Sequence, residues 1–302
     1  MSIIAEITLI AVVVSVACSL PGVFLVLRGT TMVSDAITHT VLLGIVLAFF
    51  ITQDLNSPFL IIGATFMGVF TVWVIEALQR TKLLGDDAAI GIVFPLFFSV
   101  AIILITRYTG DIHLDQDTVL MGELAFAPFR RLTFFGVDIG ARAFITMVII
   151  LLINAGFIAL FYKELKVTTF DAAFAAAVGF SPILIYYGLM TLVSLTAVGA
   201  YDSVGSILVV GFMVGPGLTA YLLTNELKKM IGGTVLIAVI NSIVGVRLAF
   251  ILDSSIAGMI AVITGIVCFL AFTFSPTKGL IRNLLNRRKR QKKFDEKVKN
   301  VY

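Results

Sequence analysis

The chain has 302 residues, of which 59% are hydrophobic and only 13% are charged. Soluble domains contain about 45–50% apolar residues, so this composition excludes an ordinary soluble protein and indicates one that crosses a membrane several times. The formal net charge of +4 comes from residues 277–302, which carry ten Lys and Arg side chains against Asp295 and Glu296. We expect this basic tail to contact anionic membrane lipid rather than nucleic acid.

Apolar runs of about 20 residues, the length needed to cross a bilayer, recur along the chain ahead of this tail. We therefore predict an all-α membrane helical bundle with one transmembrane domain over residues 1–276 and a cytoplasmic tail over residues 277–302. The first and seventh runs are the weakest, so eight spans are the alternative to nine. The predicted spans are 5–27, 36–52, 58–79, 88–106, 141–162, 183–201, 204–224, 233–252 and 255–274.

Basic residues are concentrated in alternate connections, and membrane proteins place such connections in the cytoplasm. The tail lies on the same side, so we predict an amino terminus outside the cell and a cytoplasmic carboxyl terminus. The cytoplasmic connections would contain Arg28, Arg80, Lys82, Lys163, Lys166, Lys228 and Lys229, and the outer ones Arg107, Arg130, Arg131, Arg142 and Arg247.

Asp35 and His39 stand four residues apart at the head of the second predicted span. Ionisable groups inside a span are costly and typically functional, and residues one helical turn apart share a face. A carboxylate and an imidazole suit Mn²⁺ and Fe²⁺, and Zn²⁺ accepts them as well. The pair therefore predicts a metal site, while the alternative is that Asp35 caps a helix beginning near Ala36 and His39 bonds to a neighbouring helix.

Two further acidic or imidazole groups are weaker metal candidates. His113 lies among Asp111, Asp115 and Asp117 in the long outer connection between residues 107 and 140, which either collects cations or is a solvated acidic loop. Asp202, between the sixth and seventh predicted spans, either lines an outer vestibule or caps the next helix. Gly215-Pro216-Gly217 could also interrupt the seventh span, as in the discontinuous helices of transporters, although such residues are common in ordinary membrane helices.

The connection between residues 163 and 182 predicts a short cytoplasmic helix. Asp171 can cap its start, an alanine-rich run follows, and Gly179 and Pro182 can end it. Small side chains such as Ala176 would permit close approach of a partner protein, with Phe170 and Phe174 as apolar anchors. We therefore predict a docking helix there.

Several blocks of the sequence resemble the metal permeases of the ABC-3 family, the transmembrane subunits of manganese, zinc and iron ATP-binding-cassette importers. The Leu27-Arg28-Gly29 segment, followed by residues 34–44, is similar to the arginine-glycine and "DAISHAVLPG" block of that family, with Thr38 in place of serine and Leu43 in place of proline. Residues 87–94, 119–122, 170–179, 197–199 and 204–210 keep the order of the family's further blocks. The resemblance covers most of the chain.

This resemblance implies a type II importer-like permease in the plasma membrane of a prokaryote. It implies a second permease copy or a sister permease, two cytoplasmic ATPases bound at the short helix, and an extracellular metal-binding lipoprotein that delivers the metal. The sequence has no G-x-x-x-x-G-K-[ST] phosphate loop, so ATP hydrolysis would belong to the partner and the chain itself would not be an enzyme. A gradient-driven metal carrier is the alternative function, although no inverted repeat is evident.

Overall fold

The computed structural model describes residues 3–54, 57, 59–108, 124–134, 137–276 and 278–282. Within those ranges, nine helical segments are long and apolar enough to cross a membrane, which confirms the predicted number of spans. They are α1 (Ile3–Arg28), α2 (Thr31–Thr52), α3 (Phe59–Arg80), α4 (Asp86–Tyr108), α6 (Arg142–Leu160), the two halves of α9 (Pro182–Leu223), α10 (Leu227–Ile251) and α11 (Ile256–Phe274).

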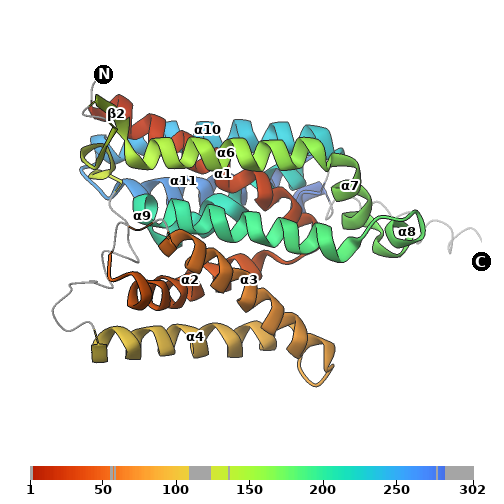
Figure 1. Cartoon of the computed structure of the whole chain (residues 1–302). Coiled ribbons are helices and arrows are strands. Elements are labelled where there is room, and N and C mark those ends of the chain that lie inside the picture. The colour runs from red at the N-terminus through yellow and green to blue at the C-terminus, as the bar shows by residue number, and fades with distance from the viewer. Residues whose placement is uncertain are drawn as a thin grey trace, which may run out of the picture.

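The helices run side by side, and α1 lies in the centre of the bundle (Figure 1). It packs against α6, α9 and α10, and it also touches α2. At one edge of the bundle, α4 packs on α2 and α3. The main core cluster draws buried side chains from most of these helices, with Val14, Cys18 and Phe212 among them. The predicted all-α membrane bundle is therefore confirmed.

Two helices begin more than one turn earlier than their apolar runs predicted. Helix α2 begins at Thr31 rather than near Ala36, and α10 begins at Leu227 rather than near residue 233. Polar residues fill the additional first turns, including Ser34 in α2 and Lys228 in α10. Hydropathy therefore places the start of each span after these polar residues, whereas the backbone hydrogen bonds of the helix include them.

Helix α9 contains two spans that fold back on each other at Gly205. Its backbone angles of φ 74° and ψ 164° lie in a region that only glycine readily adopts. Ile185 from the first half and Ala220 from the second half belong to the same buried cluster, so the chain reverses direction between them. The helix continues through Gly215, Pro216 and Gly217, so the interruption that we considered there is wrong, and the break lies at Gly205.

Glycine permits the closest approach between α1 and α9. A Cβ atom added to Gly22 would lie 1.8 Å from the carbonyl oxygen of Met213, so no larger residue fits without moving a backbone. Small residues at helix contacts are typical of membrane bundles, because close packing has to replace the hydrophobic effect as the driving force.

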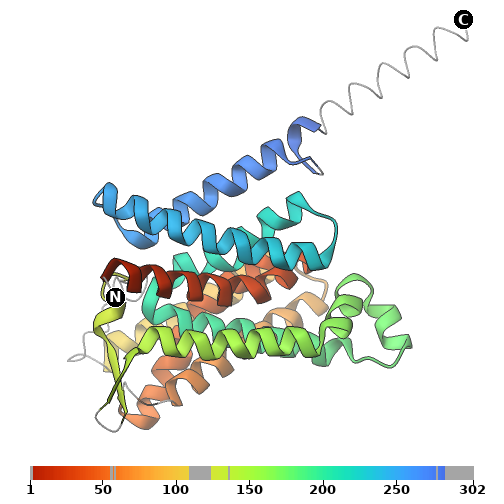
Figure 2. The same cartoon turned by 90° about the horizontal axis from the view of Figure 1, so that it is seen from above.

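The two ends of the bundle carry different additional elements. At the end with the amino terminus, the 3₁₀ helix η1 (Ala127–Phe129) precedes an antiparallel hairpin of β1 (Arg131–Phe134) and β2 (Val137–Ala141). At the opposite end lie α7 (Tyr162–Phe170) and α8 (Ala172–Ala177), as Figures 1 and 2 both show. The sequence pattern did not predict the hairpin or α7.

Candidate metal centre

The connection from α1 to α2 fixes where the metal candidates lie. Gly29, at φ +70°, donates its N–H to the carbonyl of Val26 at 3.2 Å, and the N–H of Thr30 reaches the carbonyl of Leu25 at 3.0 Å. These two bonds form a Schellman motif, a common helix ending that favours glycine at this position. Helix α2 then begins at Thr31, directly after the motif.

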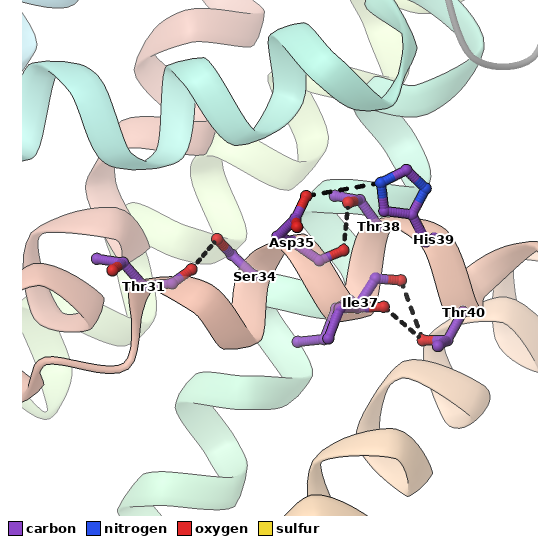
Figure 3. Close-up of polar contacts among 8 residues, drawn as sticks. Thr31, Ser34, Asp35, Ile37, Thr38, His39 and Thr40 are labelled. Atoms are coloured by element: carbon purple, nitrogen blue, oxygen red, sulfur yellow. Dashed lines mark hydrogen bonds and ion pairs between the residues drawn. The ribbon is translucent and has the colours of Figure 1, made fainter. Parts of the chain in front are cut away.

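Asp35 consequently lies in the second turn of α2 and does not cap it, so the capping alternative is wrong. Its Oδ1 is 3.6 Å from Nε2 of His39, and both side chains point to the same side of the helix (Figure 3). The Asp35 side chain is 47% exposed and that of His39 is 20% exposed. The pair is therefore assembled by one helical turn and remains partly accessible.

His39 is held by aromatic rings and not by a hydrogen bond to a neighbouring helix. Its ring centroid is 4.9 Å from that of Phe94 and 5.6 Å from that of Phe98, both in α4. In the described part of the chain, its buried Nδ1 atom has no hydrogen-bond partner. The alternative in which His39 bonds to a neighbouring helix is therefore also wrong. Packing orients the imidazole, and its Nε2 atom is turned toward Asp35.

Other polar residues of α2 bond either to α3 or within the helix itself. The hydroxyl oxygens of Thr40 and Thr71 are 2.9 Å apart, which joins α2 to α3. Thr38 donates to the carbonyl of Asp35 at 2.8 Å, and Ser34 donates to that of Thr31 at 2.6 Å. Successive helix residues are about 100° apart, so Thr40 lies on a different face from Asp35. One face of α2 therefore packs on α3, and another face carries Asp35 and His39.

The geometry of the pair suits one transition-metal ion. Bonds from nitrogen or oxygen ligands to such ions are about 2.0–2.2 Å long, so donor atoms 3.6 Å apart can both bind a single ion. Among the described residues, no group of three or more His, Cys, Asp or Glu side chains gathers at one place. Within the part of the chain that the structure describes, the pair therefore has no cluster of further His, Cys, Asp or Glu side chains beside it.

The structure does not describe the side chain of either weaker metal candidate. His113 lies outside the described residues. The backbone of Asp202 belongs to α9, between the spans Pro182–Tyr201 and Ser203–Leu223 and close to the reversal at Gly205. The side chain of Asp202 is not described.

The predicted short helix is present as α8. Asp171 caps it by accepting a hydrogen bond from the N–H of Phe174 at 2.9 Å. Gly179, at φ +94°, donates to Ala176 at 3.1 Å, and Phe180 donates to Ala175 at 3.0 Å. These bonds form a second Schellman motif, which ends α8. Pro182 does not contribute to that ending, because it begins α9.

Helix α8 presents an apolar surface at this end of the bundle. Phe174 is 57% exposed and Val178 is 55% exposed, whereas Ala175 is fully buried. Phe170, the last residue of α7, is 64% exposed, and Ala176 is exposed as well. One side of α8 thus packs on the protein, and its phenylalanine side is exposed.

Sequence reasoning did not identify the aromatic contacts of His39. Phe94 belongs to one of the family-like blocks, 87–94, which was the only available signal. It also did not identify the role of Arg28, whose guanidinium bonds to α7 with Nη2 3.0 Å from the Thr168 hydroxyl. In the sequence, Arg28 was notable only for its charge and its place in the arginine-glycine block.

Comparisons with known proteins agree on one class of protein, the membrane components of transport systems. The family described as the ABC 3 transport family matches residues 1–275. The chain is 46% identical to the zinc transport system membrane protein TroD of Treponema pallidum over 93% of its own length and 76% of TroD. It is 42% identical to the manganese transport system membrane protein MntD of Bacillus subtilis, over 97% of its own length and 99% of MntD.

A solved structure supports the same fold. The structure of PsaBC from Streptococcus pneumoniae in complex with Fab contains a chain that matches with a TM-score of 0.76 and 27% identity. The match covers 92% of this chain and 94% of that one.

Proposed function

Because the chain belongs to the ABC 3 transport family, we propose that it is the permease subunit of an ATP-binding-cassette importer that carries a divalent metal cation into the cytoplasm. It is a multi-pass membrane protein of a transport system, and permease subunits of such importers are not themselves catalytic. Membership in this family also decides against the alternative of a gradient-driven carrier.

The observation that carries the choice of substrate is the pair formed by Asp35 and His39, with donor atoms 3.6 Å apart on one helix face. One carboxylate and one imidazole, without thiolate, favour Mn²⁺ or Fe²⁺ and accept Zn²⁺. The names of the relatives do not choose among these metals, since one names zinc and another manganese. We take Mn²⁺ as the first substrate to test, followed by Zn²⁺ and Fe²⁺.

A second permease copy, or a sister permease, would complete the metal shell. These ions usually take a shell of four to six ligands, so two protein ligands leave at least half of the shell empty. Asp35 is half-exposed, so further ligands from another chain have access to the ion. His113 and Asp202 remain candidates for passing metal toward this site from the outer side.

Two further partners would act at opposite ends of the bundle. The exposed apolar side of α8, with Phe170 and Phe174 as anchors, would fit a groove on a cytoplasmic ATPase dimer. Asp171 and Gly179 would set the two ends of this docking helix, and Ala176 would allow close approach. At the other end, an extracellular metal-binding lipoprotein would dock near η1 and the hairpin. The basic tail would lie along anionic lipid on the cytoplasmic side.

Transport would proceed by alternating access. The metal would enter from the outer side, exchange part of its hydration shell for the Asp35 carboxylate and the His39 imidazole, and leave when the helices around the pair rearrange. The binding of ATP by the partner would supply the energy for that rearrangement through α8. Only movement of α2 relative to its neighbours is required, because Asp35 and His39 lie on the same helix.

The decisive experiment reconstitutes the chain with its co-encoded ATPase in vesicles and measures Mn²⁺ uptake and metal-stimulated ATP hydrolysis. Asp35→Asn and His39→Ala should both lose uptake while the complex still assembles, because each removes one ligand. Asp86→Asn is the matched control, since Asp86 is exposed in the first turn of α4. Normal uptake by either ligand variant, or stimulation of the wild type by none of the three metals, would overturn the proposal.

A further inference from the structure

One guanidinium joins three helices at the end of the bundle that carries α8. Arg28 is the last residue of α1, and its Nη2 and Nε donate to the hydroxyls of Thr168 and Thr169 in α7, at 3.0 and 3.3 Å. Its Cζ atom lies 5.6 Å from the ring centroid of Tyr186 in α9. Arg28 thus contacts α7 and α9 from the end of the central helix.

The chemistry of this contact is specific to arginine. The two N–H groups donate from one edge of a planar fork to two adjacent hydroxyls, a geometry that a lysine ammonium cannot reproduce. Thr168 is 4% exposed, and its own hydroxyl donates to the carbonyl of Glu164 at 2.8 Å. Its lone pairs are therefore oriented toward Arg28 by a bond within α7, and the contact as a whole is partly buried.

Arg28 is connected to the metal candidates by a short and ordered piece of backbone. The Schellman motif at Gly29 and Thr30 directly follows Arg28, and α2 begins immediately after it, at Thr31. Thr30 also accepts a hydrogen bond from the N–H of Val33 at 3.1 Å, so the connection is bonded to both helices. A shift of Arg28 must therefore move the start of α2, where Asp35 lies in the second turn.

At its other end, α7 continues directly into α8. Asp171 is both the residue after α7 and the N-cap of α8, and its N–H donates to the carbonyl of Val167 at 2.9 Å. A path of covalent and hydrogen-bonded neighbours therefore runs from the exposed apolar side of α8 through Thr168 and Arg28 to Asp35. Each of these connections is short.

We propose that Arg28 is a positioning residue that transmits movement of α7 and α8 to the Asp35 and His39 segment of α2. This inference rests on the proposed function, because it names how the partner ATPase would act on the metal pair. Arg28 does not touch the metal. It sets where the ligands lie when α8 moves.

The neighbouring turn of α9 extends this contact toward α3. Tyr187 donates its hydroxyl to Oε2 of Glu76 at 2.5 Å, and its ring meets that of Tyr186 edge-on at 5.5 Å. Because Tyr186 faces Arg28 and Tyr187 faces α3, this turn of α9 is held between α1 and α3. Tyr186, the α9 neighbour of Arg28, is therefore held in place by its own contacts when Arg28 moves.

The test uses the complete transporter in vesicles and compares Arg28→Gln with Arg28→Lys. We expect both variants to bind the ATPase and keep its basal ATP hydrolysis, while Mn²⁺ transported per ATP falls by about five- to tenfold in Arg28→Gln. Arg28→Lys should recover only part of that loss, because it restores the charge without the fork. Lys229→Gln, an exposed charge change in the first turn of α10, is the control and should transport normally.

A second variant keeps the test decisive if Arg28→Gln fails to assemble. Thr168→Val with Thr169→Val removes both acceptors at nearly constant volume and should reproduce the loss of coupling. Adding these changes to Arg28→Gln should cause little further loss, since all three remove the same interaction. Normal coupling in the double-valine variant would overturn the inference while leaving the proposed function intact. Absent transport by the wild type would instead refute the proposed function.

Discussion

The Asp35 carboxylate and the His39 imidazole differ in how they are held. Asp35 is half-exposed, and its position follows only from the second turn of α2, whereas His39 is clamped by two rings of α4. An aromatic contact of this kind contributes about 0.5–1.5 kcal/mol. The orientation of the imidazole, and with it the affinity for metal, should therefore depend on α4.

Phe94→Ala should weaken metal binding without abolishing transport. Losing one ring contact worth about 1 kcal/mol would raise the Mn²⁺ concentration for half-maximal stimulation of ATP hydrolysis by about fivefold and leave the maximal rate nearly unchanged. Phe66→Ala is the control, because Phe66 is 71% exposed on α3. An unchanged half-maximal concentration in Phe94→Ala would show that the ring does not position His39.

Sequence alone identified Asp35 and His39 because their polarity and spacing are local properties of one helix. It could not identify Phe94 and Phe98 as their neighbours, because the packing of α4 on α2 joins residues that are distant in the chain. For the same reason, the sequence could not exclude that Asp35 caps a helix. The structure excludes it, because α2 begins at Thr31. Local patterns specify the candidates, and tertiary contacts decide their roles.

At the scale of elements, hydropathy predicted all nine spans, because the interior of a bilayer imposes length and apolarity on each helix. It located the ends less well where polar first turns continue a helix, as in α2 and α10. The hairpin and α7 were not predicted, since neither has to be apolar enough to cross a membrane. The reversal at Gly205 was also missed, because glycine occurs throughout these spans and only its backbone angles distinguish it.

Gly205→Ala should destabilise the protein measurably. A residue with a Cβ at φ 74° and ψ 164° carries strain of about 1–3 kcal/mol, which should lower the midpoint of thermal unfolding in detergent. Gly232→Ala is the control, because Gly232 lies within α10 and a Cβ there meets nothing within 4 Å. That variant should be neutral or slightly stabilising. Equal unfolding midpoints for both variants would contradict the assigned backbone conformation.

Helix α8 should be the element that binds the ATPase. Phe174→Glu places a charge on its exposed apolar side and should reduce copurification of the ATPase, because burying an unpaired charge is costly. Lys166→Glu, an exposed change on α7, is the control and should leave recovery of the ATPase normal. Normal recovery of the ATPase with Phe174→Glu would place the contact on another element.

At the scale of the whole molecule, the charge distribution and the fold together predict the orientation in the membrane. Helices α7 and α8 lie at the end opposite the amino terminus (Figures 1 and 2). The basic connections at Arg80 and Lys228 should share that side, which would be cytoplasmic.

Single cysteines in a variant lacking Cys18 and Cys268 can test this orientation. Lys82→Cys, in the turn after α3, should react with an impermeant thiol reagent only after the cells are opened. Ser254→Cys, an exposed position between α10 and α11, should react in intact cells. The reverse pattern would invert the predicted topology, and equal labelling of both sites would contradict the nine-span order.

The central claim is that the transported metal binds to Asp35 and His39, and pulsed electron paramagnetic resonance of Mn²⁺ bound to the purified transporter tests it most directly. The chain has two histidines, His39 and His113, so a nitrogen signal from coordinated imidazole can be assigned with two variants. We predict a nitrogen signal that is lost in His39→Gln and kept in His113→Gln. A signal that persists in His39→Gln, or its absence from the wild type with bound Mn²⁺, would contradict the proposed metal centre.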